Sequence, residues 1–359
     1  MQLTLPRADL ARVIGNVARV VEARNTIDIL GSLLLDATVD GDGKGKLTVT
    51  ATDLDIVVTD AAEADVAAAG RICVDAKLLG EIAKKVGGDI IMKLDDGRLI
   101  VKSGRSRYVL ETRDPVDFPS LDGGTFDATL DVDLAALFAP VAFAIAVKES
   151  RHYLEGIYLH VIDGKLTAVA TNGHRLARHV GDEAPEFEGV IVAQKPVSII
   201  AGVKGVARVS VSQQKLRIEA GDFIMTTKLI EGDYPDYRRV IPVGNPLTVT
   251  AEKADILKAA ERVTVVSNER GNAVKMSVAP GSITMAVRGP SGEAVDEVAA
   301  EYAGEPTEIG FNSIYLRDAL QVLPDGPVDI ALRDSGSPAH ITSPAYPALD
   351  ITLMPVRVS

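Results

Sequence analysis

The chain has 359 residues, and its 38 Lys and Arg against 50 Asp and Glu give a net charge of −12. The apolar fraction of 47% and the charged fraction of 25% are those of an ordinary globular protein, and they exclude a disordered or collagen-like chain. A single cysteine, Cys73, excludes an internal disulfide and a cysteine-based structural zinc site.

The sequence carries no signal for secretion or for membrane insertion. Its amino-terminal segment lacks a basic stretch followed by an apolar one, and no run of 18 apolar residues occurs. We therefore expect a cytoplasmic protein that does not contact membranes. The negative net charge repels nucleic acid from the molecule as a whole, but a global sum hides any local basic face.

Taken in chain order, the predicted elements begin with a helix and a strand that occur twice. Residues 7–24 have apolar side chains at helical spacing, and the alternating segment Lys-Leu-Thr-Val-Thr-Ala-Thr-Asp at 46–53 predicts a half-buried strand. A second helical pattern at 133–148 precedes Lys-Leu-Thr-Ala-Val-Ala-Thr-Asn at 165–172. The two strand segments start 119 residues apart, at positions 46 and 165, which indicates an internal repeat.

A fainter third copy follows, and each copy has a second short helix. The third copy combines a weak helical pattern at 251–270 with Ser-Ile-Thr-Met-Ala-Val at 282–287. The second helices are predicted at 75–87, 193–205 and 312–323, and Pro and Gly weaken the middle one. Each unit is therefore predicted to run as strand, helix, several strands, helix and several strands.

Turn-forming residues separate the three units. Breaks rich in Gly, Pro, Asp and Asn fall at 120–124 and at 242–246. A period near 120 residues is too long for a solenoid repeat. We expect an α+β protein of three tandem similar domains, 1–123, 124–244 and 245–359.

The predicted helices are the basic part of an acidic chain. The six helical segments hold 15 Lys or Arg and 10 Asp or Glu, a net of +5, so the remaining residues carry −17. Ordinary solvated helix faces explain this distribution equally well on charge alone. A shared DNA-facing role is the alternative that remains open.

Physical chemistry indicates what such a role requires. Non-specific phosphate contacts give a Kd of about 10⁻⁴–10⁻⁶ M at physiological salt. With association near ~10⁸ M⁻¹s⁻¹, the residence time is only about 0.1–10 ms. Prolonged attachment to DNA without sequence preference therefore needs a closed ring rather than affinity.

The whole chain resembles the DNA polymerase III beta subunit family, the bacterial beta sliding clamps. The motifs that carry the resemblance occur in the family's order, and they are Ile-Leu-Gly-Ser-Leu-Leu-Leu at 29–35, Thr-Asp-Leu at 52–54, Ser-Gly-Arg-Ser-Arg-Tyr at 103–108, Ala-Thr-Asn-Gly-His-Arg-Leu at 170–176, Tyr-Pro-Asp-Tyr-Arg-Arg-Val at 234–240, Ser-Asn-Glu at 267–269, Ile-Gly-Phe-Asn at 309–312 and Leu-Met-Pro-Val-Arg at 353–357.

The resemblance implies the DNA clamp fold, in which each domain packs two helices on antiparallel sheets. It also implies a head-to-tail homodimer that closes as a six-domain ring around duplex DNA, without sequence preference. The implied clients are the DNA polymerase III alpha subunit, the clamp loader, and other polymerases and repair proteins, all held through short linear motifs. No catalysis, cofactor or metal is implied.

The resemblance also implies a hydrophobic pocket that binds these linear motifs. Leu, Val, Met and Pro would form its floor, and Arg and Thr at the rim would bind peptide carbonyls. The matching positions are Arg151, Tyr153, Leu154, Thr171, Gly173, His174, Arg175, Leu176, Pro235, Arg239, Val240, Thr352, Leu353, Met354, Pro355, Val356 and Arg357.

DNA-contact and dimer positions follow in the same way. For DNA, Arg24 and Lys148 match the family. The helix charge count alone adds Lys77, Lys84, Lys85, Lys195, Lys204, Arg262 and Arg317. For the dimer contact, the family points to Tyr108 in the first domain and to Val265 and Val266 in the third. Core packing is the alternative role for these three.

Four features of the sequence suggest other chemistry. His174 in Thr-Asn-Gly-His-Arg suggests catalysis, but no nucleophile motif such as G-x-S-x-G accompanies it. Asp53 and Asp55 are better explained by a turn than by a cation site, and the glycine-rich segment 41–46 by a hairpin than by a phosphate loop. Cys73 between apolar neighbours is expected to be buried and unreactive.

Two other classes of protein stay open. A monomeric three-domain interaction scaffold without DNA would share the repeats, and its monomeric mass would distinguish it from a ring. A hydrolase on this fold would need an acid, a base and a nucleophile together, and the sequence suggests no such set.

Overall fold

The computed structural model describes residues 1–119, 124–267, 273–289 and 292–358. These residues form two compact units. The first consists of 1–134 with 198–229, and the second of 135–197 with 230–359. We describe each unit by itself.

The first unit is built on one continuous antiparallel sheet and two helices. In the described residues the strand order is β10-β15-β16-β17-β4-β3-β2-β6-β9-β8-β7-β1-β5. The strands are β1 (Gln2–Leu5), β2 (Ser32–Val39), β3 (Gly45–Thr52), β4 (Ile56–Glu63), β5 (Asp65–Ala68), β6 (Gly70–Asp75), β7 (Ile90–Asp95), β8 (Arg98–Ser103), β9 (Ser106–Arg113), β10 (Ala128–Val132), β15 (Ala207–Val211), β16 (Lys215–Ala220) and β17 (Phe223–Lys228).

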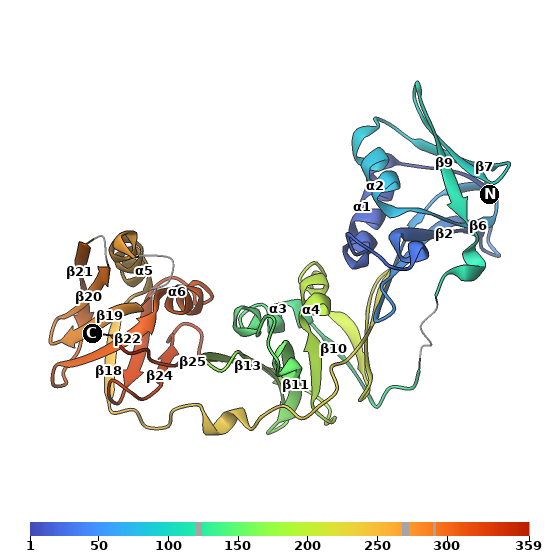
Figure 1. The fold of residues 1–359 in the computed structure, drawn as a ribbon. Coiled ribbons are helices and arrows are strands. Elements are labelled where there is room, and N and C mark those ends of the chain that lie inside the picture. The colour runs from blue at the N-terminus through green and yellow to red at the C-terminus, as the bar shows by residue number, and fades with distance from the viewer. Residues whose placement is uncertain (120–123, 268–272, 290–291, 359) are drawn as a thin grey trace. The chain divides into compact units, whose positions relative to one another are not determined.

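Two helices of this unit, α1 (Arg7–Val17) and α2 (Ala76–Lys85), pack side by side (Figure 1). The apolar stripe of α1 is buried, which is why the amphipathic pattern forms a helix here. At the start of α2 the Asp75 side chain accepts the N–H of Leu78 at 2.7 Å, a helix cap.

The second unit is built on another continuous sheet. Its described strand order is β14-β11-β12-β13-β25-β24-β23-β18-β21-β20-β19-β22. The strands are β11 (Gly156–Ile162), β12 (Lys165–Thr171), β13 (Arg175–Glu183), β14 (Val190–Ala193), β18 (Leu247–Glu252), β19 (Ala273–Ala279), β20 (Ser282–Gly289), β21 (Gly292–Glu301), β22 (Thr307–Asn312), β23 (Pro327–Leu332), β24 (Ala339–Thr342) and β25 (Leu349–Leu353).

Four further helices complete the chain: α3 (Leu134–Phe138), α4 (Gln194–Ile200), α5 (Lys253–Val263) and α6 (Ser313–Gln321). Both α3 and α4 cross the division between the two units. The cap of α6 matches that of α2, because Asn312 Oδ1 accepts the N–H groups of Ile314 and Tyr315 at 2.9 and 3.3 Å.

The repeated strands and helices are confirmed at their predicted places, but several helices are shorter than predicted. Helix α1 ends at Val17 instead of 24, α4 at Ile200 instead of 205, and α5 at Val263 instead of 270. The helix predicted over 133–148 ends at Phe138 and is followed by a 3-10 turn at Ala142–Ala144. Pro140 explains the early end, because proline lacks an N–H and disfavours helical backbone in the residue before it. Of the predicted helix at 251–270, residues 268–270 lie outside the described part, as do 268 and 269 of the Ser-Asn-Glu motif.

The two units divide the second predicted domain between them. Its part at 198–229 joins the first unit because β17 pairs with β4, with Ile224 opposite Thr59. Its part at 135–197 joins the second unit because β13 pairs with β25. The boundaries 1–123, 124–244 and 245–359 stay a prediction, and residue 123 lies outside the described residues.

The smaller sequence predictions are confirmed. Segment 41–46 joins the antiparallel strands β2 and β3, as expected of a hairpin. Cys73 is fully buried, and desolvation raises the pKa of its thiol to about 11, so it is unreactive at neutral pH. In the described residues no helix is long and apolar enough to cross a membrane.

Candidate functional site

A tight turn between β12 and β13 supplies one wall of a cavity. The hydroxyl of Thr171 donates to the carbonyl of Arg175 at 2.7 Å and accepts the N–H of Gly173 at 3.1 Å. Asn172 Oδ1 accepts the N–H groups of His174 and Arg175 at 2.9 and 3.0 Å. Gly173 has φ +85°, a left-handed conformation that glycine adopts without strain. The Thr-Asn-Gly-His-Arg motif therefore encodes this turn.

The first repeat builds the same turn with different residues. The Thr52 hydroxyl donates to the carbonyl of Ile56 at 2.8 Å, and Asp53 Oδ1 accepts the N–H groups of Asp55 and Ile56 at 3.0 and 2.7 Å. Leu54 stands where Gly173 does, with φ +81°. These hydrogen bonds confirm Asp53 as a turn residue.

The turn at 171–175 faces the end of β25 and the segment 235–240, and together they enclose a cavity of about 190 Å³. The whole cavity lies within the second unit. Its lining residues are Arg151, Leu154, Thr171, Gly173, Arg175, Leu176, Pro235, Asp236, Tyr237, Val240, Thr352 and Met354. All but Asp236 and Tyr237 are among the positions that the sequence suggested.

Stacked rings hold segment 235–240 against the sheet. Tyr234 stacks on Tyr158 of β11 with ring centroids 4.7 Å apart, and Tyr158 stacks on His160 at 4.6 Å. His160 Nε2 hydrogen-bonds the Tyr237 hydroxyl at 3.1 Å. Burial raises the pKa values of Tyr234 and Tyr237 and lowers that of His160, so all of these rings are neutral at neutral pH. The ring of Tyr237, which lines the cavity, is therefore uncharged.

Arg175 is clamped between two aromatic rings. Its guanidinium lies 5.0 Å from the Phe143 ring centroid and 4.6 Å from that of Tyr315 on α6. Its Nη1 pairs with Asp318 Oδ2 at 2.7 Å, and its Nη2 donates to the carbonyl of Phe143. The side chain is therefore held rigidly in the cavity wall.

Two buried polar atoms in the lining have no hydrogen-bond partner among the described residues. They are Arg175 Nε and Thr352 Oγ1, and Thr352 is only 1% exposed. An unpaired buried polar group costs about 1–3 kcal/mol.

Seven of the positions suggested from the sequence do not line the cavity. For Leu353 the reason is the alternation of side chains along a strand. Side chains alternate along β25 and its continuation, so Thr352 and Met354 face the cavity while Leu353 is fully buried in the core. His174 instead stacks on Tyr315, with ring centroids 6.1 Å apart. Val356 donates its N–H to the carbonyl of Gly310 at 2.8 Å. The others are Tyr153, Arg239, Pro355 and Arg357.

Asp236 and Tyr237 line the cavity but were not predicted from the sequence. Both stand inside the Tyr-Pro-Asp-Tyr-Arg-Arg-Val motif, between the chosen Pro235 and Arg239. Tyr237 is 4% exposed, and a buried aromatic beside a proline-containing turn was the available signal.

Replacing Gly173 by Ala tests how far the turn governs the cavity. A left-handed conformation costs a residue with a Cβ about 1–2 kcal/mol. The new Cβ would also lie 3.3 Å from Arg151 Nη2 at the cavity rim. We expect a lower free energy of unfolding by about 1 kcal/mol in urea titration, with weaker ligand binding in the cavity.

Leu54→Gly is the matched control, because Leu54 already has a left-handed backbone in the corresponding turn. It removes strain outside the cavity, so we expect no loss of stability and no change in ligand binding. Equal effects of the two substitutions would show that the turn does not shape the cavity.

Family models match the chain along nearly its whole length. The models for the N-terminal, central and C-terminal domains of the DNA polymerase III beta subunit match residues 1–122, 131–236 and 238–357. The beta sliding clamp of Caulobacter vibrioides strain NA1000 is 39% identical over 378 aligned residues, and that of Escherichia coli K12 is 32% identical over 372, each covering 100% of both chains. The chain belongs to the DNA polymerase III beta subunit family. It is a DNA sliding clamp, a processivity factor of replication and not an enzyme.

A solved sliding clamp has the same fold. The structure from Bartonella birtlesii, described as bound to griselimycin, has a TM-score of 0.95 and 36% identity, covering 100% of both chains. The α+β fold of three tandem clamp domains is thereby confirmed.

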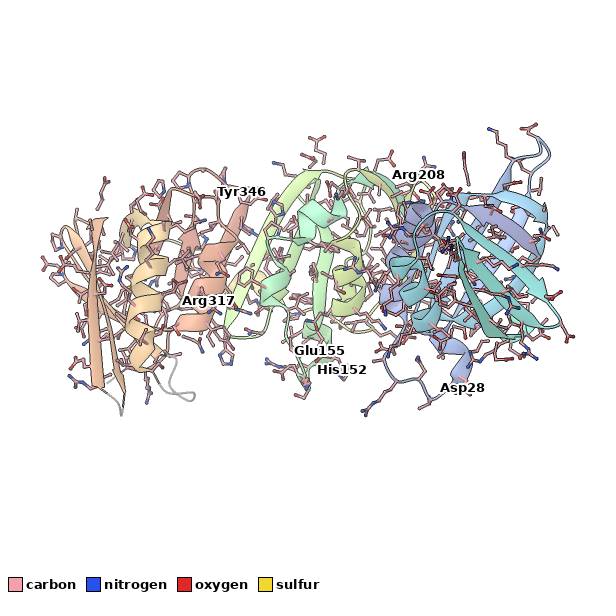
Figure 2. The ribbon with its side chains drawn as sticks, turned by 90° about the horizontal axis from the view of Figure 1, so that it is seen from above. Asp28, His152, Glu155, Arg208, Arg317 and Tyr346 are labelled. Atoms are coloured by element: carbon pink, nitrogen blue, oxygen red, sulfur yellow. The ribbon has the colours of Figure 1, made fainter. Side chains whose placement is uncertain are left out.

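The DNA-contact candidates of this sliding clamp are at least partly exposed, but their ion pairs differ. Lys84 and Lys85 lie 3.5 and 3.2 Å from Glu81 on the same helix. Arg262 pairs with Asp296, and Arg317, on α6, lies 3.5 Å from Asp318 (Figure 2). The remaining candidates are Arg24, Lys77, Lys148, Lys195 and Lys204. Lys195 is half-buried and the other candidates are exposed.

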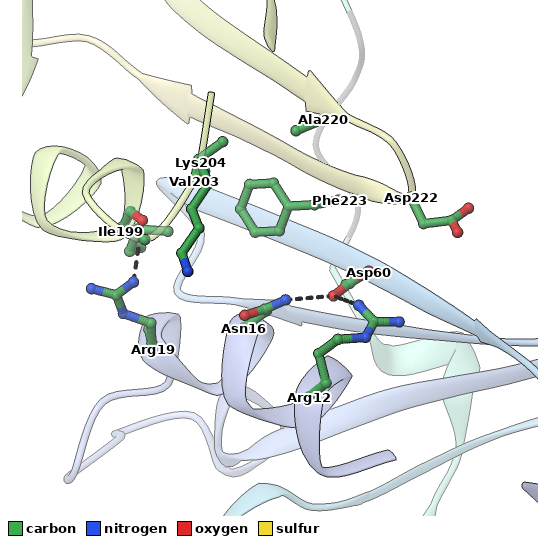
Figure 3. Close-up of a pocket in the computed structure, with 11 residues that line it drawn as sticks. Arg12, Asn16, Arg19, Asp60, Ile199, Val203, Lys204, Ala220, Asp222 and Phe223 are labelled. Carbon is green, nitrogen blue, oxygen red and sulfur yellow. Dashed lines mark hydrogen bonds and ion pairs between the residues drawn. The ribbon is translucent and has the colours of Figure 1, made fainter. Parts of the chain in front are cut away.

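Two basic residues that were included in the helix charge count bind other parts of the protein and are therefore not free to contact DNA. Arg12 binds the buried Asp60 carboxylate at 3.0 Å, and Arg19 donates to the carbonyls of Ser198 and Ile199. Both line a cavity of about 440 Å³ within the first unit, where Lys204 also points inward (Figure 3). The net of +5 therefore overstates the charge available to DNA.

The three dimer candidates differ in exposure. Val265 is 82% exposed, so the core-packing alternative is wrong for this residue, whereas Tyr108 and Val266 are half-buried. Tyr108 lies on β9 opposite Val101 of β8. On its other side β9 pairs with β6 only at Thr112 and Arg113 in the described residues, so the strand edge at Tyr108 is open.

Proposed function

We propose that two copies of the chain close head to tail into a six-domain ring around duplex DNA. The open edge at Tyr108 and the exposed Val265 support a contact between the first domain of one copy and the third domain of the other. The domains would be 1–123, 124–244 and 245–359. The mildly basic helices tolerate the duplex, and the acidic remainder discourages binding outside the ring.

The cavity at 171–175 is proposed to hold the clients. One observation carries this assignment: the apolar side chains of Leu154, Leu176, Pro235, Val240 and Met354 line one cavity together with the polar side chains of Arg151 and Arg175. Such a combination suits an extended peptide, whose apolar side chain fills the floor and whose backbone pairs with the polar atoms. Met354 adapts to clients of different shape.

The clients would be the DNA polymerase III alpha subunit, the clamp loader, other polymerases and repair proteins, each through a short linear motif. The protein would act in the cytoplasm, at the nucleoid. A monomeric scaffold without DNA is the competing function, and it predicts a particle of 37.9 kDa instead of about twice that mass.

Retention on circular DNA tests the ring. The purified protein is loaded onto nicked circular DNA, and the circle is then cut once at constant salt. We expect the protein to remain on the circle and to leave after cutting, because linear DNA has an end. Equal retention on both forms would indicate charge-based binding, and no retention after competent loading would favour the scaffold.

A further inference from the structure

One carboxylate of α6 is shared between the cavity wall and a DNA-contact candidate. Asp318 Oδ2 lies 2.7 Å from Arg175 Nη1, and its Oδ1 lies 3.5 Å from Arg317 Nη2. The Arg175 and Asp318 side chains are 11% and 24% exposed, and Arg317 is 44% exposed. The first pair is therefore the better shielded from solvent.

Helix α6 thus shapes a cavity that it does not line. Asp318 binds the outer end of the Arg175 guanidinium, and Tyr315 covers one of its faces. Tyr315 also stacks on His174, the neighbour of Arg175 in the turn. Neither Asp318 nor Tyr315 belongs to the lining. Their effect on a ligand would pass through Arg175.

We propose that Asp318 is a positioning residue of the client cavity, and that Arg175 and Arg317 compete for its carboxylate. This inference rests on the proposed client-binding function. The two arginines bind different oxygens of this carboxylate, and the cation of Arg317 repels Arg175 and attracts Asp318 away from it. A DNA phosphate that binds Arg317 would weaken both effects, so Asp318 would hold Arg175 and the cavity wall more firmly. DNA and client binding then favour each other, because coupling between two sites is reciprocal.

A double-mutant cycle tests the competition without DNA. The probe is the purified DNA polymerase III alpha subunit, and its Kd is measured by surface plasmon resonance against the full-length protein. Asp318→Asn should weaken binding about tenfold, because each 1.4 kcal/mol is tenfold in Kd. Arg317→Ala should tighten binding about twofold and should have no effect when Asp318→Asn is also present.

Two further variants separate positioning from general damage. Asp318→Glu keeps the charge and should restore binding to within about threefold of the unaltered protein. Glu308→Gln removes another paired carboxylate of the third domain, 2.8 Å from Lys275 and outside the cavity, and should leave the Kd unchanged. Melting temperatures are measured for all variants.

Each contrary result has a distinct meaning. Unchanged binding by Asp318→Asn, while the unaltered protein binds the alpha subunit, overturns the inference and leaves the proposed function standing. If Arg317→Ala changes the Kd equally in the unaltered protein and in the Asp318→Asn variant, the proposed competition is wrong. Failure of the unaltered protein to bind the alpha subunit overturns the proposed function itself.

Discussion

Deletion of residues 354–359 is expected to abolish binding of the DNA polymerase III alpha subunit. The deletion removes Met354 from the cavity lining, and it exposes the fully buried Leu353 and the unpartnered Thr352 hydroxyl beside it. Met354 is half-buried in the single chain, and fully burying a Met side chain stabilises a complex by up to about 3 kcal/mol. We therefore expect the Kd to rise more than 30-fold in surface plasmon resonance.

A shorter deletion, of residues 357–359, is the matched control. It keeps Met354, Pro355 and Val356, and with them the hydrogen bond from the Val356 N–H to the carbonyl of Gly310. This variant should bind the alpha subunit normally. Both deletions should remain dimeric in sedimentation experiments, because no dimer candidate lies in the tail. Normal binding by the longer deletion would place the client site elsewhere.

The second large effect is expected from Val265→Asp at the proposed dimer contact. Val265 is 82% exposed in the single chain, so a charge there is solvated in the monomer and does not disturb folding. In the dimer the carboxylate would be buried without a partner, which costs about 3–5 kcal/mol. Sedimentation at low micromolar concentration should therefore show a folded monomer of 37.9 kDa.

Val243→Asp provides the comparison, because Val243 is 84% exposed in the irregular segment that precedes β18. It introduces the same charge at a site of equal exposure that no dimer prediction includes. This variant should sediment as a dimer and stay on nicked circular DNA. A dimeric Val265→Asp protein would refute the interface assignment, and two monomeric variants would mean that added charge alone opens the ring.

The cavity at 171–175 depends on both local sequence and tertiary structure. The turn at 171–175 was predictable, because Thr, Asn and Gly at these positions satisfy its hydrogen bonds and its left-handed backbone locally. The repeated strand at 165–172 was equally predictable from alternation, and it forms β12. The ion pair between Arg175 and Asp318 was not predictable, because the two residues lie 143 positions apart.

The three repeats, the places of the helices and strands, and the family could be predicted from sequence alone. The repeats and the elements depend on side chains within a few residues of one another, through periodicity and turn chemistry. The pairing of β17 with β4 and of β13 with β25, which divides the second predicted domain between two units, is a property of the folded chain. The tertiary structure also decides which side of β25 faces the cavity. Pairing between distant strands leaves no local pattern, because it depends on surfaces that meet only after the chain has folded.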